Sequence, residues 1–390
     1  MQYKIPFSGR AHKYTTEEQN TVIDVMQNAT TLTQGIFQES FQKKFCDFLP
    51  IEFAFALNNA TSALVLSAQL CQFQAGDEVI IPSHTYTASA YPFLKQGAKI
   101  VWADIDASTR VVSTKTIQAC ITSKTKAIVV VHLYGYCADM PEIMQLAKEN
   151  NLIVIEDCAQ AIGTKINGKM AGSFGDIGIF SFHSHKNIST LGEGGMISVK
   201  DEKFAKIIPL LRHHGHCDFS YDREKYWMPA MGNLDFPELD GKKIWPNNFC
   251  IGEVECALGA KLLDRVEHMN LEKRRRALRF IDELEEFNDI EFHRIDTERH
   301  NYHLLVGKIA NNKRDLFIDK MSQKGVQCVV QYYPLNRYDF YIKAGYGEAK
   351  CPSADNFYDN MVSFPFSDIM DFNLFEEMLD ITKHVLAELA

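Results

Sequence analysis

Short apolar runs alternate with amphipathic stretches along the first two-thirds of this 390-residue chain. Such alternation is typical of βαβ units, which build a largely parallel sheet. The runs AIVVVH and LIVIE carry apolar residues at successive positions, so helices should cover both faces of the sheet. Strands are expected at residues 53–57, 78–81, 99–102, 127–132, 152–155, 177–181 and 196–199, and helices at 60–71 and 141–150.

A different pattern begins near residue 250. Residues 252–286 are rich in Ala, Leu, Glu and Arg at helical spacing, which predicts one long helix. A smaller α+β domain should follow, with short strands near 290–292 and 303–309, a helix at 315–324, the apolar run 326–332 and a final helix at 372–389. We therefore expect a large domain over residues 1–250 and a small one over 251–390, with the long helix as the hinge.

Charge and cysteine content restrict the class of protein. Acidic residues outnumber basic ones by 50 to 41, which argues against a nucleic-acid partner. The sequence has neither a run of about 18 apolar residues for a membrane helix nor the apolar segment of a signal peptide. Ten cysteines are scattered without a CxxC pair, which favours reduced thiols over a zinc site or disulfides. A cytoplasmic enzyme without membrane or nucleic-acid partners is expected.

A lysine follows one of the buried strands, in the segment GIFSFHSHKNISTLGEGGMISV. Lys186 comes five residues after the strand end at Ser181, and the GEGG run allows a tight turn before the next strand. This position places the lysine at the edge of the sheet where α/β proteins bind ligands. Taken alone, it would equally fit a solvated lysine and an ordinary turn.

Three further segments end at the same edge. Asp157 closes the apolar run IVIED and needs a donor or a positive partner there, as a helix cap or as the counter-ion of a cationic ring. The segment LNNATSAL leads from a strand into a helix, whose first N–H groups would bind a phosphate or simply be capped. Tyr86 follows another strand. A lysine, an anion, an aromatic ring and a phosphate cup together meet the needs of pyridoxal 5′-phosphate.

The chain resembles the DegT/DnrJ/EryC1/StrS sugar aminotransferases, a family of fold type I, aspartate aminotransferase-like enzymes that use pyridoxal phosphate. The resemblance is carried by GDEVIIPSHTYTASA, VVHLYGYCADM, EDCAQAIGT, GSFGDIGIFSFHSHKNISTLGEGGMI, LRHHGH and CALGAKLLDRVE, and it weakens after about residue 300. It implies an α/β protein in which helices cover a mostly parallel, seven-stranded sheet, with a smaller C-terminal α+β domain.

The resemblance also implies roles for individual residues at the cofactor. Lys186 would form the Schiff base and Asp157 would pair with the ring nitrogen. Gln160 would contact the ring hydroxyl. The remaining cofactor contacts would be Tyr86 over the ring face and Ala60, Thr61 and Ser181 at the phosphate, with Asn248 supplied by the neighbouring subunit of a homodimer.

Histidines near the site are expected to line the substrate side, not to bind metal. His183 and His185 flank Lys186, and Tyr332 is assigned to the same lining. The cluster at residues 213–216 has no acidic or cysteine partner at ligand spacing, and members of the family have histidine there without metal. No metal is therefore expected.

The activity implied is transfer of an amino group, expected from L-glutamate, to a keto carbon of a sugar, expected to be nucleotide-linked. Such transfers make deoxy amino sugars for surface polysaccharides or secondary metabolites, and the two substrates would alternate on one site. A cyclitol aminotransferase would look the same at the cofactor. A sugar dehydratase of this fold usually has histidine in place of Lys186. A regulatory or sensor protein that binds the cofactor without turnover is the alternative of another class.

Two positions depart from the family pattern. The family commonly has arginine where this chain has Cys250, and many members have histidine where it has Asn336. Both differences leave the cofactor chemistry intact and bear on the acceptor.

Overall fold

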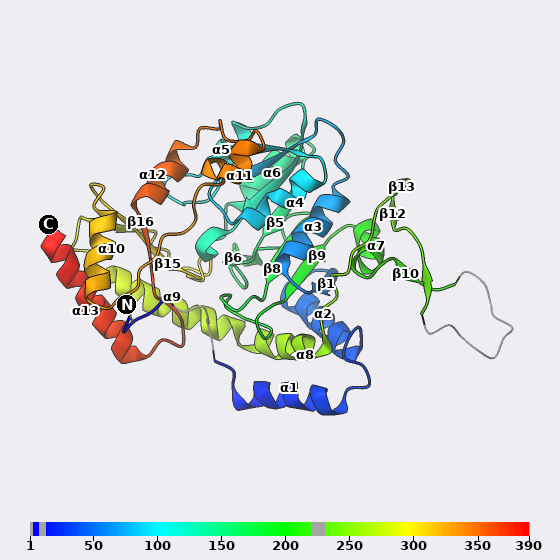
Figure 1. The fold of residues 1–390 in the computed structure, drawn as a ribbon, viewed down its shortest axis with the longest axis horizontal. Helices are drawn as coiled ribbons and strands as arrows, with labels where there is room; N and C mark the ends of the chain where they lie inside the picture. The colour runs from blue at the N-terminus through cyan, green and yellow to red at the C-terminus, as the bar shows by residue number, and fades with distance from the viewer. Residues whose placement is uncertain (1–2, 8–12, 220–230, 390) are drawn as a thin grey trace.

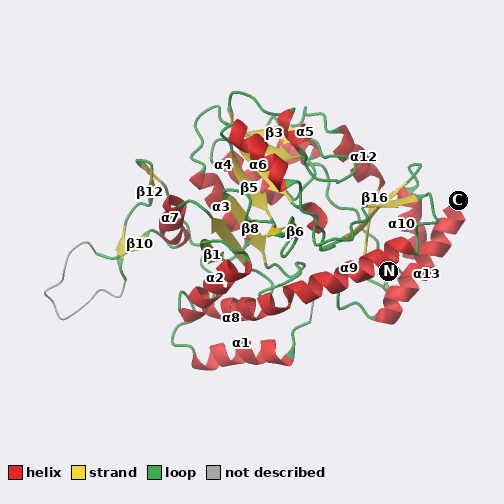
Figure 2. Cartoon of the chain, turned by 180° about the vertical axis from the view of Figure 1, so that it is seen from behind, coloured by secondary structure: helices red, strands yellow, loops and turns green. Residues whose placement is uncertain are grey.

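The computed structural model describes residues 3–7, 13–219 and 231–389 (Figures 1 and 2). Its main element is a seven-stranded sheet in the order β1-β9-β8-β5-β4-β2-β3. The strands are β1 (Phe53–Leu57), β2 (Glu78–Pro82), β3 (Lys99–Ala103), β4 (Thr125–Val131), β5 (Ile153–Asp157), β8 (Ile177–Ser181) and β9 (Gly195–Val199). Only β9 runs against its neighbours, so the mostly parallel seven-stranded sheet is confirmed.

Helices cover the sheet on both faces, as the continuous apolar runs predict. Every residue of β8 and β9 is buried. The helices of this part are α1 (Thr16–Asn28), α2 (Ile36–Phe48), α3 (Ala60–Leu70), α4 (Tyr91–Lys95), α5 (Thr114–Gln118), α6 (Met140–Glu149), α7 (Glu202–Arg212) and α8 (Glu253–Leu262). Helices α1 and α2, which were not expected from the sequence, pack against α8.

A smaller sheet lies beside the large one in Figure 2 and is antiparallel throughout. It contains β14 (Ile290–Phe292), β15 (Leu305–Ile309) and β16 (Met361–Phe364). Around it lie α9 (Val266–Asp282), α10 (Arg314–Gln323), α12 (Pro352–Asn360) and α13 (Phe372–Leu389), while α11 (Asp339–Lys343) packs near the large sheet. The apolar run at 326–332 forms no strand among the described residues and contributes only single bridges, one of them between Val326 and Ile5.

The single helix expected over residues 252–286 is wrong in two respects, its continuity and its end. A 3₁₀ turn, Leu263–Arg265, separates α8 from α9, and α9 ends at Asp282. Leu262, Leu263 and Val266 are all buried around this turn. A tightened turn shifts the direction in which successive side chains point, which hydrophobic spacing alone does not reveal.

Buried apolar residues form two clusters, one around each sheet. Helix α9 contributes to both, because Met269 belongs to the larger cluster and Ala277 and Phe280 belong to the smaller one. A boundary at residues 250–251, with this helix as the hinge, stays a prediction. None of the helices in the described part of the chain combines the length and apolar composition that crossing a bilayer requires.

Candidate active site

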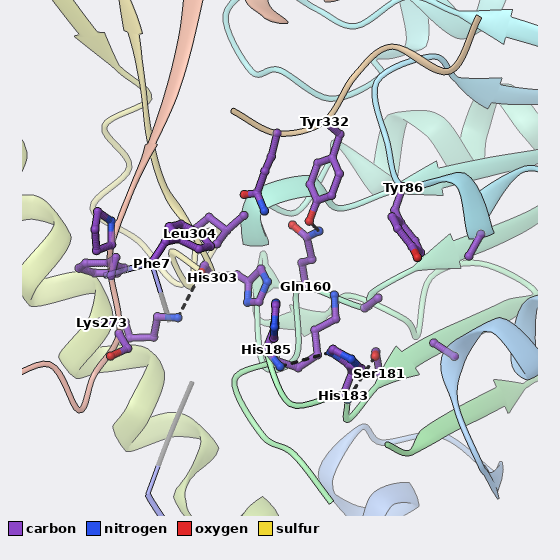
Figure 3. A pocket seen from close by; sticks show the side chains of 18 of the residues that line it. Phe7, Tyr86, Gln160, Ser181, His183, His185, Lys273, His303, Leu304 and Tyr332 are labelled. Atoms are coloured by element: carbon purple, nitrogen blue, oxygen red, sulfur yellow. Dashed lines mark hydrogen bonds between the residues drawn. The ribbon is translucent and has the colours of Figure 1, made fainter. Parts of the chain in front are cut away.

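A cavity of about 780 Å³ opens at the carboxyl ends of the parallel strands (Figure 3). Strands β2, β4, β5 and β8 point the same way, so the residues that follow them meet at one edge of the sheet. The sequence-predicted residues that line this cavity are Ala60, Thr61, Tyr86, Asp157, Gln160, Ser181, His183, His185, Lys186 and Tyr332. Segments more than 270 residues apart in sequence thus form one chemical environment.

Lys186 lies in the loop between β8 and β9. Backbone hydrogen bonds close this loop, from Phe182 N to Gly194 O at 2.8 Å and from Lys186 N to His183 O at 2.8 Å. Loss of contact with water lowers the pKa of Lys186 to about 8, although the negative charge of Asp157 opposes the shift. The amine is therefore much easier to deprotonate than an exposed lysine, and a neutral amine is the form that attacks a carbonyl.

Asp157 ends β5, and two donors hold its carboxylate. Ser89 Oγ donates to Oδ2 at 2.8 Å, and Ala159 N donates to Oδ1 at 3.1 Å. No basic side chain lies within ion-pair distance of it in the described chain. A buried carboxylate with free lone pairs facing a cavity is suited to a cationic N–H group of a ligand.

The first turn of α3 provides a place for an anion. Asn59 caps the helix by accepting a hydrogen bond from Ser62 N at 2.8 Å. The N–H groups of Ala60 and Thr61, the first two of the helix, have no partner among the hydrogen bonds of the described residues. These groups, the positive end of the helix dipole and the Ser181 hydroxyl line the same part of the cavity, as a phosphate site requires.

Gly195 allows β9 to approach the start of α3. A Cβ atom at this position would lie 2.4 Å from the carbonyl carbon of Asn59 and 2.7 Å from the nitrogen of Ala60. Any larger residue would therefore push the phosphate-binding turn away from the sheet. This contact explains why the chain needs glycine at the end of the GEGG run.

Gln160 links its own segment to those of Tyr134 and Tyr332. Its Oε1 accepts from Tyr134 N at 2.7 Å, and its Nε2 donates to the Tyr332 hydroxyl at 3.0 Å. Burial raises the pKa of Tyr332 to about 12, so its hydroxyl keeps its proton. Tyr86 is 59% exposed and its ring centroid lies 6.4 Å from that of Tyr332, which leaves its face accessible to a ligand.

The two histidines beside Lys186 differ in their surroundings. His183 Nε2 lies 3.8 Å from Glu193 Oε1. His185 is more exposed, and partial desolvation together with the charges of His183 and Lys186 lowers its pKa. Both line the cavity, and neither is hydrogen-bonded to Lys186 through its side chain among the described contacts.

Asn248, Cys250 and Asn336 do not line the cavity of their own chain. Asn248 pairs through its backbone with His213. Cys250 Sγ lies 3.8 Å from Arg212 O, and Asn336 is buried with its Nδ2 donating to Ala349 O. A contribution from any of them to substrate binding would have to come from a second subunit or through neighbouring residues.

Sequence reasoning missed several cavity residues. Ser89 follows Tyr86 by three residues, in the 3₁₀ turn Thr87–Ser89, and nothing in its sequence context pointed to Asp157. Others come from the N-terminal segment and from the small domain: Pro6, Phe7, Lys273, His303, Leu304 and Phe366. Their role depends on long-range contacts, which sequence spacing does not contain.

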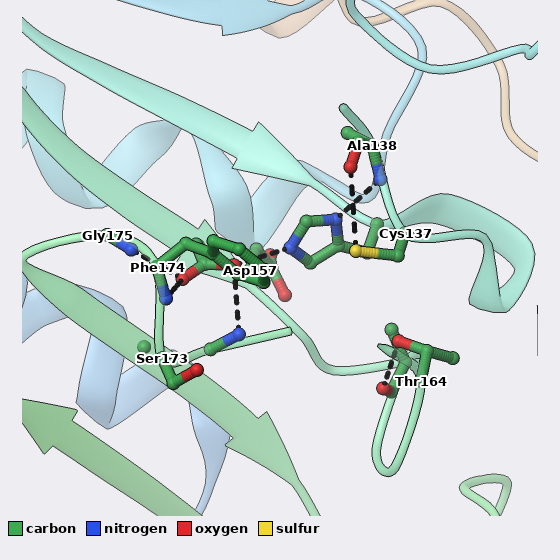
Figure 4. Close-up of polar contacts among 12 residues, drawn as sticks. Cys137, Ala138, Asp157, Thr164, Ser173, Phe174 and Gly175 are labelled. Carbon is green, nitrogen blue, oxygen red and sulfur yellow. Dashed lines mark hydrogen bonds and ion pairs between the residues drawn. The ribbon is translucent and has the colours of Figure 1, made fainter. Parts of the chain in front are cut away.

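One buried group has the composition of a metal site, formed by His132, Glu156 and Cys158. Both nitrogens of His132 are already engaged, Nδ1 by Ala138 N at 3.1 Å and Nε2 by Glu156 at 3.0 Å. Glu156 also accepts from the backbone N–H groups of Gly172, Phe174 and Gly175, the last two of which are labelled with Ala138 in Figure 4. This group therefore fastens the loop before β8 to β4 and β5, with the hydrogen-bonding atoms of His132 and Glu156 already engaged. Burial raises the pKa of the Cys158 thiol, which disfavours the thiolate that a metal would need.

Comparison with known proteins identifies the family. The profile of the DegT/DnrJ/EryC1/StrS aminotransferase family matches residues 12–380. The chain is 34% identical to GDP-perosamine synthase of Caulobacter vibrioides, with 82% of each chain covered. It is 33% identical to UDP-N-acetyl-3-dehydro-alpha-D-glucosamine 3-aminotransferase of Acidithiobacillus ferrooxidans, covering 79% of this chain and 77% of the relative.

The fold is likewise similar to solved structures. An aminotransferase from Psychrobacter cryohalolentis superimposes with a TM-score of 0.87 at 27% identity, covering 98% of this chain and 99% of the other. The seven-stranded sheet and the small domain are thus those of fold type I enzymes. By the match along nearly its whole length, the chain belongs to the DegT/DnrJ/EryC1/StrS aminotransferase family.

Proposed function

We propose that this aminotransferase moves an amino group from L-glutamate to a keto carbon of a nucleotide-linked sugar. Membership of the family makes the chain a transaminase that uses pyridoxal 5′-phosphate. Two relatives support the choice of acceptor, since the names GDP-perosamine synthase and UDP-N-acetyl-3-dehydro-alpha-D-glucosamine 3-aminotransferase both refer to nucleotide-linked sugars.

The residues present fit the cofactor. A phosphate would be held by the free N–H groups of Ala60 and Thr61 and by the Ser181 hydroxyl. Asp157, held by Ser89 and Ala159, would face the ring nitrogen. When bound, pyridoxal phosphate supplies a carbonyl that takes up an amino group and a ring that accepts an electron pair.

The chain's own groups then have distinct tasks. Lys186 Nζ would hold the cofactor covalently between reactions and, once released, carry a proton between the substrate carbon and the cofactor. Asp157 would keep a proton on the ring nitrogen through a charge-assisted hydrogen bond. Gln160 and Tyr332 would position another part of the ring. The hydrogen bond from Gln160 to the Tyr332 hydroxyl already holds both side chains in place.

The observation that carries this proposal is that Lys186, with its lowered pKa, and Asp157 line one cavity with the start of α3. The test is the donor half-reaction. Purified enzyme loaded with cofactor is mixed with L-glutamate alone, and one equivalent of 2-oxoglutarate per site is expected. A panel of nucleotide-linked keto sugars is then added, and the aminated product is identified by mass spectrometry.

Lys186→Ala is the matched control, because it should bind the cofactor reversibly and form no 2-oxoglutarate. Borohydride treatment of the unmodified enzyme should attach the cofactor to the peptide containing Lys186. Attachment elsewhere, or no 2-oxoglutarate from the unmodified enzyme, would contradict the proposal. If a cyclitol were aminated in preference to every sugar, the proposed acceptor would be wrong, and the proposed donor half-reaction would still stand.

A homodimer with shared sites belongs to the same proposal. The support is the position of Asn248, which lies outside the cavity of its own chain although the family resemblance assigns it to the cofactor. A cytoplasmic location is also proposed and rests on the scattered cysteines alone.

A further inference from the structure

A second lysine is buried in the cavity, at the end away from the sheet. Lys273 lies on α9, is 2% exposed, and lines the cavity with residues of the small domain and of the N-terminal segment. Its Nζ donates to Asn187 Oδ1 and to His303 O, both at 3.0 Å; Figure 3 shows the contact with His303. An ammonium group has three N–H donors, so one remains for a further partner.

This ammonium group has no carboxylate within 4.0 Å among the described residues. Burial lowers the pKa of Lys273 to about 8, and Asp368, which acts only at longer range, opposes the shift. A buried cation without an ion-pair partner is costly, and a charged ligand would remove that cost.

The walls around Lys273 would strengthen such an interaction. The Phe366 ring centroid lies 5.6 Å from Nζ, and Figure 3 shows Phe7 and Leu304 at the same end of the cavity as Lys273. Apolar walls exclude water, so a charge-assisted hydrogen bond there is stronger than at the surface. Lysines elsewhere in the described cavity lining are Lys186 and the exposed Lys13.

His303 lies between the segments that carry the two lysines in the lining of the cavity. Its carbonyl accepts from Lys273 Nζ at 3.0 Å, and its Nδ1 lies 3.2 Å from Oδ1 of Asn187, the residue after Lys186. Burial, and after it the charges of Lys186 and Lys273, hold the pKa of His303 well below its usual value. A substrate that reacts at Lys186 and extends along the cavity toward His303 would therefore bring its other end to Lys273. Both substrates of the proposed reaction carry an anionic group away from the reacting carbon.

We propose that Lys273 binds the anionic group of a substrate, either a carboxylate of the amino donor or a phosphate of the nucleotide-linked acceptor. This inference rests on the proposed function for the identity of the substrates. Lys273 also contacts Asn187, which is adjacent to Lys186 in the chain, so a purely structural role has to be separated from binding.

The experiment measures binding to the cofactor-loaded enzyme by calorimetry, with glutarate as the carboxylate probe and UDP and GDP as the phosphate probes. Lys273→Gln should weaken one class of probe by about tenfold or more, since a hydrogen bond to a charged group is lost. Lys273→Arg keeps the charge and should retain most of the affinity. Arg275→Gln removes the same charge from an exposed position on α9 and should change neither affinity.

Loss confined to glutarate assigns Lys273 to the donor, and loss confined to the nucleotides assigns it to the acceptor. In steady-state kinetics the same substrate should show a raised KM. Equal behaviour of the unmodified enzyme and Lys273→Gln toward all three probes, including a shared failure to bind, would overturn the inference. A second outcome would also overturn the inference: the Gln and the Arg variants both lose cofactor content and thermal stability to the same extent, while each loaded site keeps its affinity for the probes.

Failure of the proposed function would look different. The unmodified enzyme would then form no 2-oxoglutarate from L-glutamate, but Lys273→Gln would still weaken probe binding. That result would support the anion site at Lys273 and contradict the proposed reaction.

Discussion

The Ser89 hydroxyl donates a hydrogen bond of 2.8 Å to Oδ2 of Asp157. Ser89 lies in the turn after β2 and Asp157 ends β5, so the bond joins two strands that are separated in the sheet by β4. With Ala159 N bound to Oδ1, the carboxylate cannot rotate freely. Its free lone pairs are therefore fixed in direction before any ligand arrives, which is what electrostatic preorganisation requires.

The first prediction compares loss of the Asp157 charge with loss of the hydrogen bond from Ser89 that holds this carboxylate. Asp157→Asn keeps the shape and removes the counter-ion, so both half-reactions should slow by an amount equivalent to about 3 to 4 kcal/mol. Ser89→Ala leaves the charge and removes one neutral donor, which should cost about 1 kcal/mol. Single-turnover rates with L-glutamate measure both. No helix directly follows β5 in the described chain, so the helix cap that the sequence allowed is ruled out. Near-normal rates in Asp157→Asn would leave the residue only the task of holding Ser89 and the turn at Ala159.

The large sheet could be predicted well from sequence. Strands β1 and β8 occupy the predicted residues, and the others shift by one or two. Buried parallel strands are nearly continuous apolar runs, which few other structures produce. The residues that follow such strands are brought together by the sheet itself, so Asp157, Tyr86 and Ser181 could be grouped without coordinates.

The second prediction concerns pH and the amine of Lys186, whose side chain is half-buried in the cavity. Its pKa in the folded protein is about 8, against 10.5 for an ordinary lysine. Between these values the unfolded chain binds a proton that the folded chain has lost, so the folded state becomes more stable as pH rises through this window. Below it both states are protonated, and the folded protein carries the full cost of the buried charge.

Lys186→Met removes this cost. In the protein freed of cofactor, the variant should unfold at a higher temperature than the unmodified chain, by a margin that is largest below pH 8 and shrinks toward pH 10.5. Lys273 titrates in the same range and is present in both proteins, so its effect cancels. A margin that does not change with pH would show that Lys186 has the pKa of an exposed lysine.

The third prediction tests the contact between β9 and the start of α3. In Gly195→Ala the added methyl group meets backbone atoms of Asn59 and Ala60 that cannot move aside easily. A loss of about 1 to 3 kcal/mol in the free energy of unfolding is expected, together with weaker binding of pyridoxal phosphate. Equilibrium titration of the cofactor-free protein measures the affinity.

Gly168→Ala is the matched control for this change. Gly168 has a φ of +75°, but its added methyl group would meet open space. The cost should be backbone strain alone, about 1 kcal/mol, with the cofactor affinity unchanged. Equal losses of affinity in the two variants would mean that general destabilisation, and not the phosphate-binding turn, is responsible.

Residues outside the large sheet were harder to predict for a physical reason. Lys273 lies in the run KRRR on α9, a composition typical of a solvated helix face. Its burial comes from Asn187, 86 residues earlier, and from the backbone of His303, and local sequence contains neither contact. Strand β16 was likewise missed, because four residues that pair with β15 and form a single bridge to Val329 leave little pattern to detect.

The last prediction concerns the shared site of the proposed homodimer. Asn248 does not line the cavity of its own chain, and its segment runs beside β1, where Phe249 O accepts from Asn58 N at 3.0 Å. From this edge of the sheet Asn248 could reach the phosphate of a second subunit. Asn248→Asp would then place a negative charge against that phosphate, which should weaken cofactor binding strongly in a partly desolvated site.

Subunit exchange separates a shared site from a self-contained one. Chains with Lys186→Ala are mixed with chains with Asn248→Asp, each inactive alone. If the sites are shared, each mixed dimer has one site with both lesions and one with neither, so activity returns. Mixing Lys186→Ala with Asp157→Ala chains is the control, because both residues line the cavity of one chain and every site keeps a lesion. Exchange shown by mass spectrometry without recovered activity in the first mixture would mean that each chain builds its site alone, and that Asn248 acts only within its own subunit.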